Sequence, residues 1–158
     1  MSRPEHTAQD PGEGGMRLTS SAFEHEMRIP TRHTCDGEGL SPQLDLSGIP
    51  SDAVALALVV DDPDAPSGTY DHWVAYDIPV METIPEGIAS LGTPGLNSSR
   101  QPGYQPPCPP SGSHRYFFTV YALDARLGLE AGADKASLLE AIEGHVLAEA
   151  TLLGRYSR

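Results

Sequence analysis

Proline and glycine divide this chain of 158 residues into short segments, and this spacing constrains its fold more than any other feature. The chain has 15 prolines and 16 glycines. Proline fixes φ and removes a backbone donor, and both residue types interrupt regular elements. The apolar runs between these breaks, such as residues 53–60 and 115–123, have the length of strands. The sequence therefore predicts a β-rich domain.

Individual strands can be assigned from the apolar pattern. Residues 23–30 are expected to form a first short strand, and residues 31–50 mostly a loop. The continuous run AVALALVV at 53–60 predicts a strand buried on both faces, although its alanines would also permit a helix. Residues 72–78 alternate loosely and predict a second central strand. The run RYFFTVYAL at 115–123 is the strongest strand signal of the chain, because it is rich in aromatic and β-branched residues.

One amphipathic helix and one tail are expected outside these strands. Apolar residues recur near helical spacing over residues 134–154, with Asp134 as a candidate N-cap and Gly154 as a candidate stop. Residues 1–17 are polar and rich in glycine and proline, which predicts a disordered tail. Residues 18–158 are long enough to form a single domain with a core of its own.

Charge and hydropathy limit the classes of partner. The net charge is −12, with a single lysine and nine arginines, and this balance disfavours nucleic acids and anionic membrane surfaces. No run of about 18 apolar residues occurs, so no membrane-spanning helix and no integral membrane location are expected. The first fifteen residues contain no apolar stretch of the kind that a secretory signal needs. We therefore expect a cytoplasmic protein.

The two cysteines, Cys35 and Cys108, do not form a CxxC pair, so a zinc ribbon or a thioredoxin-like motif is not indicated. In a cytoplasmic protein two reduced thiols are the preferred interpretation. Both lie in loops that are rich in other candidate binding residues, so the sequence also permits a disulfide between them.

Two dense clusters of ligand-binding residue types stand out. The first comprises DDPDAP at 61–66 and YDHW at 70–73; the second comprises GY at 103–104, PPCPP at 106–110 and HRY at 114–116. Each cluster couples stiff proline turns to an imidazole at or near the start of a strand. We expect the two clusters to form two walls of one preformed pocket.

The two imidazoles, His72 and His114, are the central candidates for ligand binding. A histidine can donate to an anion from both nitrogens when protonated, or from one when neutral. Side chains alternate along a strand, so His114 and Tyr116 should share one face while Arg115 points the other way. Arg115 is therefore expected to form a structural ion pair rather than to clamp a ligand.

Asp62 and Asp64 follow the end of the buried strand, on the DPDAP turn. One carboxylate could accept a hydrogen bond from a ligand or orient a histidine. The alternative is that both cap the turn, because aspartate readily bonds to nearby backbone amides. Both residues are candidates for ligand binding.

The same segments resemble the phosphatidylethanolamine-binding protein family, which includes the Raf kinase inhibitor proteins. The resemblance is carried by DPDAP at 62–66, HW at 72–73, PP at 109–110 and HRY at 114–116. Matches to the bacterial branch of that family are TCDG at 34–37, SP at 41–42, YALD at 121–124 and GH at 144–145. Together these motifs extend over residues 23–156.

The resemblance implies an antiparallel Greek-key β-sandwich with peripheral helices, one of them near the C-terminus. It also implies a pocket for small anions and phosphorylated groups, formed by Asp62, Asp64, Pro66, His72, Pro110, His114 and Tyr116. Tyr104 is expected to shape the rim. Two positions depart from the family pattern: Pro106 replaces a glycine of the loop, and Leu46 stands where a tryptophan is common. Proline at 106 removes an N–H that could otherwise donate to the anion.

The leading functional prediction is a non-catalytic protein that binds a small anionic or phosphorylated ligand, without a metal or cofactor, and that modulates a kinase or other signalling protein. The first alternative is a metal-dependent or His-assisted hydrolase, although the chain has no HExxH, GxSxG or P-loop motif. The second is a protease inhibitor that acts through a surface loop within residues 82–113. The resemblance to bacterial proteins that dimerise adds a homodimer to the expected partners.

Overall fold

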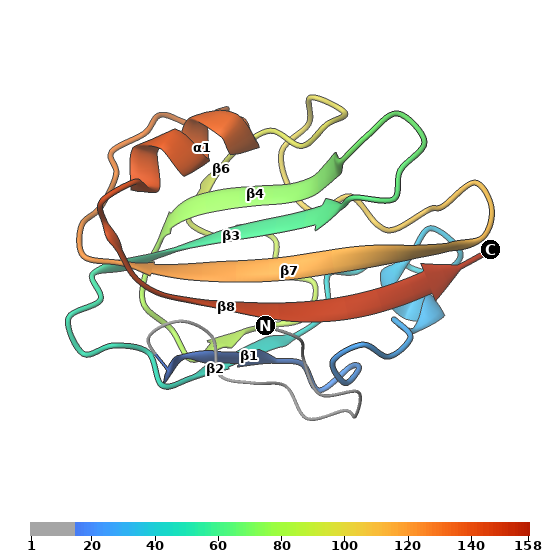
Figure 1. Ribbon diagram of the computed structural model, residues 1–158, viewed down its shortest axis with the longest axis horizontal. Coiled ribbons are helices and arrows are strands. Elements are labelled where there is room, and N and C mark those ends of the chain that lie inside the picture. The colour runs from blue at the N-terminus through green and yellow to red at the C-terminus, as the bar shows by residue number, and fades with distance from the viewer. Residues whose placement is uncertain (1–14) are drawn as a thin grey trace.

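The computed structural model describes residues 15–158, which form two antiparallel β-sheets. The larger sheet has five strands in the order β6-β4-β3-β7-β8 (Figure 1). Its strands are β3 (Ala55–Asp62), β4 (Tyr70–Ile78), β6 (Thr93–Pro94), β7 (Ser113–Leu123) and β8 (Val146–Ser157). Strand β3 lies between β4 and β7. Strands β3 and β7 are therefore neighbours in the sheet, although they are far apart in the sequence. The sheet contains the strands predicted at 53–60, 72–78 and 115–123, which are confirmed.

The smaller sheet covers one face of the larger one. It contains β1 (Arg17–Thr19), β2 (Leu44–Ser47) and β5 (Thr83–Ile84), in the order β1-β2-β5. A short 3-10 helix, Thr31–His33, precedes β2. The main core lies between the sheets, and its largest buried side chains include Met16, Leu18, Leu44, Leu58, Tyr116 and Phe118. Residues 15–158 thus form a mainly β fold, a sandwich with one peripheral α-helix.

Strand β3 is buried on both faces, as its uninterrupted apolar sequence predicts. Leu56 and Leu58 belong to the core between the sheets. Ala57 and Val59 belong to a second cluster on the outer face, where helix α1 (Lys135–Ile142) packs. Alternate side chains of one strand point to opposite faces, so both faces are apolar along residues 55–60 of β3. Alanine, leucine and valine occupy these successive positions.

Helix α1 is fixed to the sheet by polar contacts as well as by packing. Asp134 caps its first turn, accepting a hydrogen bond from the Ser137 amide at 2.9 Å, which confirms the predicted N-cap. The Lys135 ammonium lies 2.8 Å from Asp71 Oδ1 and 3.2 Å from Asp61 Oδ2. The only lysine of the chain therefore ties the helix to β3 and β4. No helix within residues 15–158 has the length and apolarity to cross a membrane.

The helix predicted over residues 134–154 is wrong in its second half. The helix ends at Ile142, and β8 follows, paired with β7 along its length. Within β8 the buried residues Ala148, Ala150 and Leu152 alternate with less buried ones. Alanine and leucine favour helices in isolation, but pairing with β7 overrides that preference. Gly154, expected to end the helix, lies inside β8.

The N-terminal part of the fold also differs from expectation. Residues 23–30 form no strand; Arg28 makes one isolated bridge to Arg155. The first strand is β1, and Met16 beside it is fully buried. The fold therefore includes the last residues of the segment 1–17 that was expected to be disordered. Residues 1–14 of that segment lie outside the described part of the chain.

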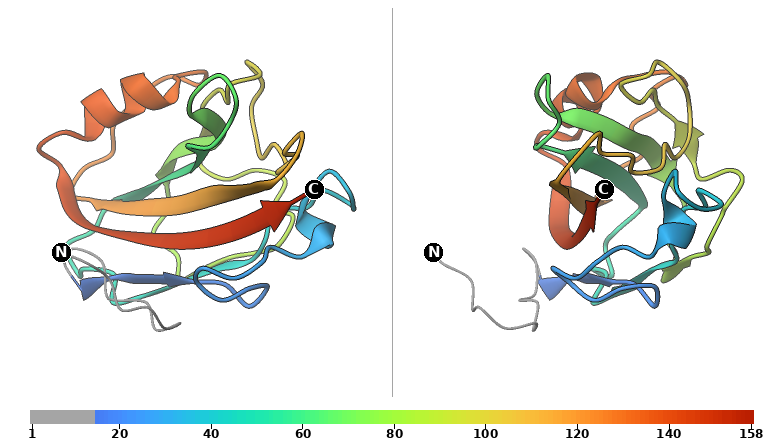
Figure 2. Two further views of the ribbon diagram at one scale, coloured as in Figure 1. Left: turned by 45° about the vertical axis from the view of Figure 1, so that its right-hand side comes forward. Right: turned by 90° about the vertical axis from the view of Figure 1, so that its right-hand side faces the viewer.

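Four strands of the larger sheet begin or end at the same end of that sheet. Strands β3 and β8 end there, and β4 and β7 begin there, at the right-hand side of Figure 1. The right-hand view of Figure 2 faces this end, which the loop before β7 and the segment around the 3-10 helix surround. Residues 82–113, expected as a long loop, contain the two-residue strands β5 and β6 and otherwise connecting segments. Both histidine clusters meet at this end.

Candidate ligand-binding site

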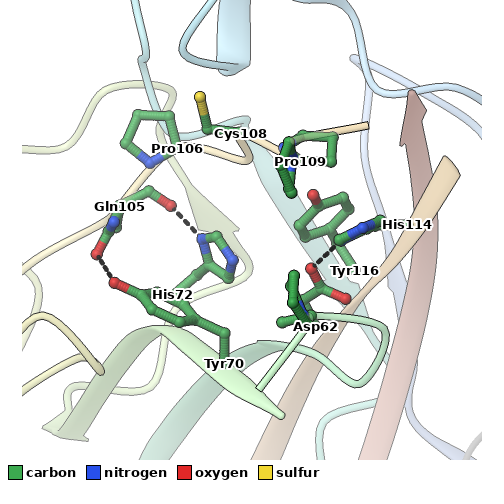
Figure 3. A pocket seen from close by; sticks show the side chains of 12 residues that line it. Asp62, Tyr70, His72, Gln105, Pro106, Cys108, Pro109, His114 and Tyr116 are labelled. Atoms are coloured by element: carbon green, nitrogen blue, oxygen red, sulfur yellow. Dashed lines mark hydrogen bonds and ion pairs between the residues drawn. The ribbon is translucent and has the colours of Figure 1, made fainter. Parts of the chain in front are cut away.

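A cavity of about 190 Å³ opens at the end of the sheet where the two histidine clusters meet. Its lining combines imidazole, phenol and carboxyl groups with four prolines (Figure 3). The lining residues are Asp62, Ala65, Pro66, Tyr70, His72, Gln105, Pro106, Cys108, Pro109, Pro110, His114 and Tyr116. The sequence-based expectation of two loops around one cavity therefore agrees with this arrangement.

The first wall is organised around His72 at the start of β4. The backbone of Gln105 makes two hydrogen bonds with His72: the Gln105 amide donates to the His72 carbonyl at 2.8 Å, and the Gln105 carbonyl lies 2.7 Å from His72 Nδ1. Tyr70 donates its hydroxyl to the Gln105 side-chain oxygen at 2.8 Å. The Tyr70 ring packs on the imidazole, with 4.9 Å between centroids. The imidazole is therefore fixed from two sides.

The second wall is organised around Asp62 at the end of β3. One oxygen of its buried carboxylate lies 2.7 Å from His114 Nδ1, and the other accepts the Asp64 amide at 2.7 Å. Asp62 thus caps its own turn and orients a histidine at the same time. Tyr116 follows on the same face of β7, and its ring lies between the two imidazoles, 5.3 Å from His72 and 6.4 Å from His114 between centroids.

The partners of Nδ1 determine which nitrogen each histidine offers to a ligand. A carbonyl or an ionised carboxylate can only accept, so Nδ1 of both His72 and His114 carries the hydrogen. The nitrogen on the opposite edge of each ring, Nε2, has no hydrogen-bond partner among residues 15–158, yet it is accessible from the cavity. Nε2 is then an acceptor in the neutral ring and a donor in the cation.

Burial sets the charge of two side chains in the cavity, His72 and Tyr116. Removal of His72 from water lowers the pKa of its imidazole, and the Gln105 carbonyl and the carboxylates of Asp62, Asp71 and Asp61 oppose that shift only in part. Burial also raises the pKa of the Tyr116 hydroxyl above its usual value, with Asp62 and Asp64 adding to the shift. Tyr116 therefore stays a neutral hydrogen-bond donor, and His72 is mostly neutral at pH 7.

Asp64, expected to contact the ligand, is directed to Arg115 instead. Its carboxylate accepts hydrogen bonds from Arg115 Nε at 2.9 Å, Nη2 at 2.8 Å and the backbone amide at 2.9 Å. The bond from the Arg115 side chain, with smaller contributions from its amide and charge, lowers the pKa of Asp64 to about 2. Asp64 does not line the cavity. The predicted structural ion pair of Arg115 is confirmed.

Tyr104, the second expected residue that does not line the cavity, supports the first wall from behind. Its hydroxyl donates to the carbonyl of His33 at 2.7 Å, and its ring packs edge-on against Trp73 with 5.4 Å between centroids. Pro66, Pro110 and the remaining expected residues line the cavity as the sequence predicts.

Tyr70 and Gln105 are two polar lining residues that were not among the predicted ligand-binding residues. Tyr70 lies two positions before His72 and so shares its face of β4, which was a usable signal. Gln105 acts mainly through its backbone, and no residue type encodes such a role. A buried asparagine, Asn97, supports both: it organises the turn at 97–101, from which Ser99 contacts the Tyr70 hydroxyl.

Pro106 forms part of the cavity wall and packs against the opposite loop. A Cβ atom added at Gly39 would lie 2.9 Å from Pro106 Cγ, so these two residues are closely apposed. Gly39 also has a φ of +73°, which favours glycine. With proline at 106, the amide of this position cannot donate to a ligand. The Tyr116 hydroxyl and protonated imidazoles are side-chain donors of the cavity lining that can take its place.

Cys35 and Cys108 form a disulfide, with 5.4 Å between their Cα atoms. The expectation of two reduced thiols is therefore wrong. The reason is tertiary: the Cys35 amide donates to the Pro107 carbonyl at 3.1 Å, so the segment after the 3-10 helix lies against the loop that carries Cys108. Contacts between segments 73 residues apart are not encoded in local pattern.

The sequence of this chain is similar to those of known proteins. Residues 19–157 match the family model described as phosphatidylethanolamine-binding protein. A UPF0098 protein of Methanothermobacter thermautotrophicus is 51% identical over 150 residues, which are 90% of this chain and 99% of that protein. A UPF0098 protein of Chlamydia muridarum is 46% identical over 149 residues, with the same shares covered.

Solved structures agree with the sequence comparison. The crystal structure of CT736 from Chlamydia trachomatis, described as a homolog of phosphatidylethanolamine-binding protein, aligns with a TM-score of 0.89 and 42% identity over 92% of this chain and 99% of that one. The E. coli protein YbcL, described as a member of the mammalian PEBP family, aligns with a TM-score of 0.83 and 26% identity over 90% of this chain and 98% of its own. Both fold and sequence therefore point to one family.

Proposed function

Because the chain belongs to the phosphatidylethanolamine-binding protein family, we propose that the cavity between His72 and His114 binds a small anionic group, such as the phosphate of a phosphomonoester, without chemical turnover. One observation carries this proposal. Two imidazoles with fixed Nδ1 atoms leave unpartnered Nε2 atoms at the same small cavity. Such a preorganised pair binds with little loss of conformational entropy.

The size and lining of the cavity support a small headgroup. A volume of about 190 Å³ accommodates a phosphate or carboxylate together with a short substituent, and it is smaller than the usual pockets for drug-sized ligands. The lining prolines, including Pro66 and Pro110, provide an apolar surface that a substituent could contact. A net charge of −12 opposes anions at long range, so the local donors must outweigh it.

The lining also favours binding over catalysis. Within the described part of the chain no serine or threonine lines the cavity, and the one lining cysteine, Cys108, is held in a disulfide. Among residues 15–158 no group of three or more His, Cys, Asp or Glu side chains is placed to hold a metal ion. These observations give no support to a metal-dependent hydrolase. His-assisted hydrolysis would need a water held between the imidazoles and a scissile group.

The two protein-directed roles stay predictions. A protease inhibitor would need a protruding loop, but the stretch at 82–113 contains the buried residues Leu91 and Asn97, and its end forms a wall of the cavity. Modulation of a kinase would require the cavity or its rim to recognise a phosphorylated partner. A homodimer and a cytoplasmic location likewise stay predictions.

The test is a titration of the purified protein with inorganic phosphate, phosphoethanolamine and a nucleotide, followed by protein-observed NMR or calorimetry. His72→Ala and His114→Ala should each weaken binding by at least about tenfold, because each removes one imidazole that donates to the anion when it is protonated. His145→Ala is the matched control, since His145 is exposed and paired with Asp124 on a different part of the surface. Unchanged binding in both cavity variants would reject the assignment.

A further inference from the structure

The Cys35–Cys108 disulfide is exposed to solvent and forms part of the cavity wall at once. Both cysteines are exposed residues, and Cys108 lines the cavity while Cys35 does not. Structural disulfides resist reduction, whereas strained or exposed ones are more labile in exchange with external thiols. An external thiolate can therefore reach this bond without opening the core.

The charges around the two sulfur atoms differ. The Arg158 guanidinium places Nη1 3.3 Å from Cys108 Sγ, while its Nη2 lies 3.3 Å from Asp36 Oδ1. Asp36, the neighbour of Cys35 in sequence, also accepts the Tyr156 hydroxyl at 2.5 Å. A cation in contact with a sulfur stabilises its thiolate. Cys108 is thus the better leaving group, and Cys35 is the sulfur open to attack.

We propose that Cys35–Cys108 is a thiol–disulfide exchange site, reduced by a dithiol and able to control the adjacent anion cavity. A thiolate of the dithiol attacks Cys35 Sγ, a new S–S bond forms to Cys35, and Cys108 leaves as a thiolate beside Arg158. The second thiol of the dithiol then displaces Cys35, which takes up a proton. Two electrons pass from the dithiol to the protein, and the dithiol becomes a disulfide.

The link to the cavity passes through the loop that carries Cys108. In this loop Gln105 lies three positions before Cys108, and its backbone makes two hydrogen bonds with His72. The same loop is tied to the segment after the 3-10 helix by the disulfide and by the bond from the Cys35 amide to Pro107. Reduction removes the only covalent tie, so the loop and its hold on His72 loosen. This coupling rests on the proposed anion-binding function.

The exchange reaction is tested first, without any ligand. The native protein is mixed with dithiothreitol, and the appearance of thiols is followed by rapid alkylation and mass spectrometry. Arg158→Gln should slow reduction by about tenfold, as the leaving thiolate loses its cation. Arg126→Gln, at an exposed position, should behave like the parent. Equal rates in the parent and Arg158→Gln, or no reduction while the protein is folded, would overturn the proposal.

The attacked sulfur provides an independent readout. A monothiol, cysteamine, is added in excess, and the mixed disulfide is trapped at low pH and located by peptide mapping. The adduct is expected on Cys35. An adduct mainly on Cys108 would contradict the role assigned to Arg158.

The coupling is tested by titrating the oxidised protein, the reduced protein and the Cys35→Ser/Cys108→Ser variant with inorganic phosphate. Reduced and double-serine proteins should bind about tenfold more weakly, because the cavity loses preorganisation. Equal affinities, or loss of the native NMR spectrum on reduction, would reject the coupling. If the oxidised protein fails to bind phosphate, the proposed function fails, while the exchange rates still decide the exchange site.

Discussion

His72 links the proposed cavity to pH at the scale of a single residue. In the free protein its pKa is lowered by burial, and its Nε2 is then an acceptor that repels an anion. An anion beside Nε2 favours the imidazolium and raises the pKa in the complex. Binding must therefore take up a proton, and phosphate affinity should rise as pH falls from about 8 to 5.5, by up to about tenfold per pH unit for one proton.

Calorimetry in buffers of different ionisation enthalpy measures this proton uptake directly. Since phosphate itself titrates in the same range, sulfate provides the matched probe, with no proton change of its own. A sulfate affinity that stays flat across the range would show that neutral donors such as Tyr116 hold the anion. The His145→Ala variant should retain the full dependence.

Asp62 and Asp64 lie two positions apart in sequence and have different tasks. Asp62 orients His114, whereas Asp64 pairs with Arg115 outside the cavity. We expect Asp62→Asn to weaken phosphate binding by about tenfold or more, because the amide cannot replace both acceptor contacts of the carboxylate. Asp64→Asn should leave affinity within about twofold and lower the free energy of unfolding by about 1 kcal/mol. Comparable losses of affinity in the two variants would contradict this division.

The stability effect of Asp64 has a defined pH range. Its pKa is lowered to about 2 in the folded protein, whereas the pKa of an unperturbed aspartate is roughly 3.9. Its contribution is therefore complete above the unfolded pKa and is lost as pH falls towards the folded one. The difference in unfolding free energy between the parent and Asp64→Asn, measured by denaturant titration, should shrink below about pH 4.

At the scale of elements, β8 shows where sequence reasoning stopped. Strands β3, β4 and β7 could be predicted because their apolar or aromatic runs are local signals. The alternation of β8 could not be recognised as easily, since small alanines occupy buried positions, Ala148 and Ala150, and alanine also suits a helix. Partner strands supply the decisive interactions, and their identity depends on contacts far apart in sequence.

The residues of the cavity, like the strands, could be predicted only where local sequence determines their position. Side chains that contact the cavity from strand ends, such as His72 and Tyr116, follow from local sequence and alternation. Gln105 contributes its backbone, and the disulfide depends on the apposition of two loops. Asp64 carries the same chemistry as Asp62, and only the turn geometry separates their roles.

Gly154 is the position at which β8 accepts no side chain. A Cβ atom there would lie 2.6 Å from Ile29 Cγ1 and 2.7 Å from Phe23 Cε2, too close for carbon atoms. Gly154→Ala should therefore lower the free energy of unfolding by about 1–3 kcal/mol through overpacking. Val146→Ala, at an exposed position of the same strand, should change it by less than about 0.5 kcal/mol. Denaturant titration compares the two, and equal effects would indicate that the 23–30 segment moves aside freely.

At the scale of the whole molecule, the charge is strongly one-sided. A net charge of −12 on 158 residues produces self-repulsion in the compact state. Raising NaCl from about 20 mM to about 0.5 M screens this repulsion, and the melting temperature should rise by a few degrees. Calorimetry or fluorescence melting in chloride salts measures the change, with sulfate and phosphate omitted because they are candidate ligands. A fall in melting temperature would show that ion pairs such as Arg115–Asp64 outweigh the net repulsion.

Lys135 has a consequence for anyone who attaches a probe to this protein. Burial alone would lower the pKa of its ammonium, but the contacts with Asp71 and Asp61 outweigh burial and raise it. Acylating reagents such as succinimidyl esters react with the uncharged amine, so this side chain is a poor target. The chain has no other lysine. Fluorophores and surface linkers of that chemistry would therefore modify the side chains of this chain poorly and would leave the helix–sheet contact intact.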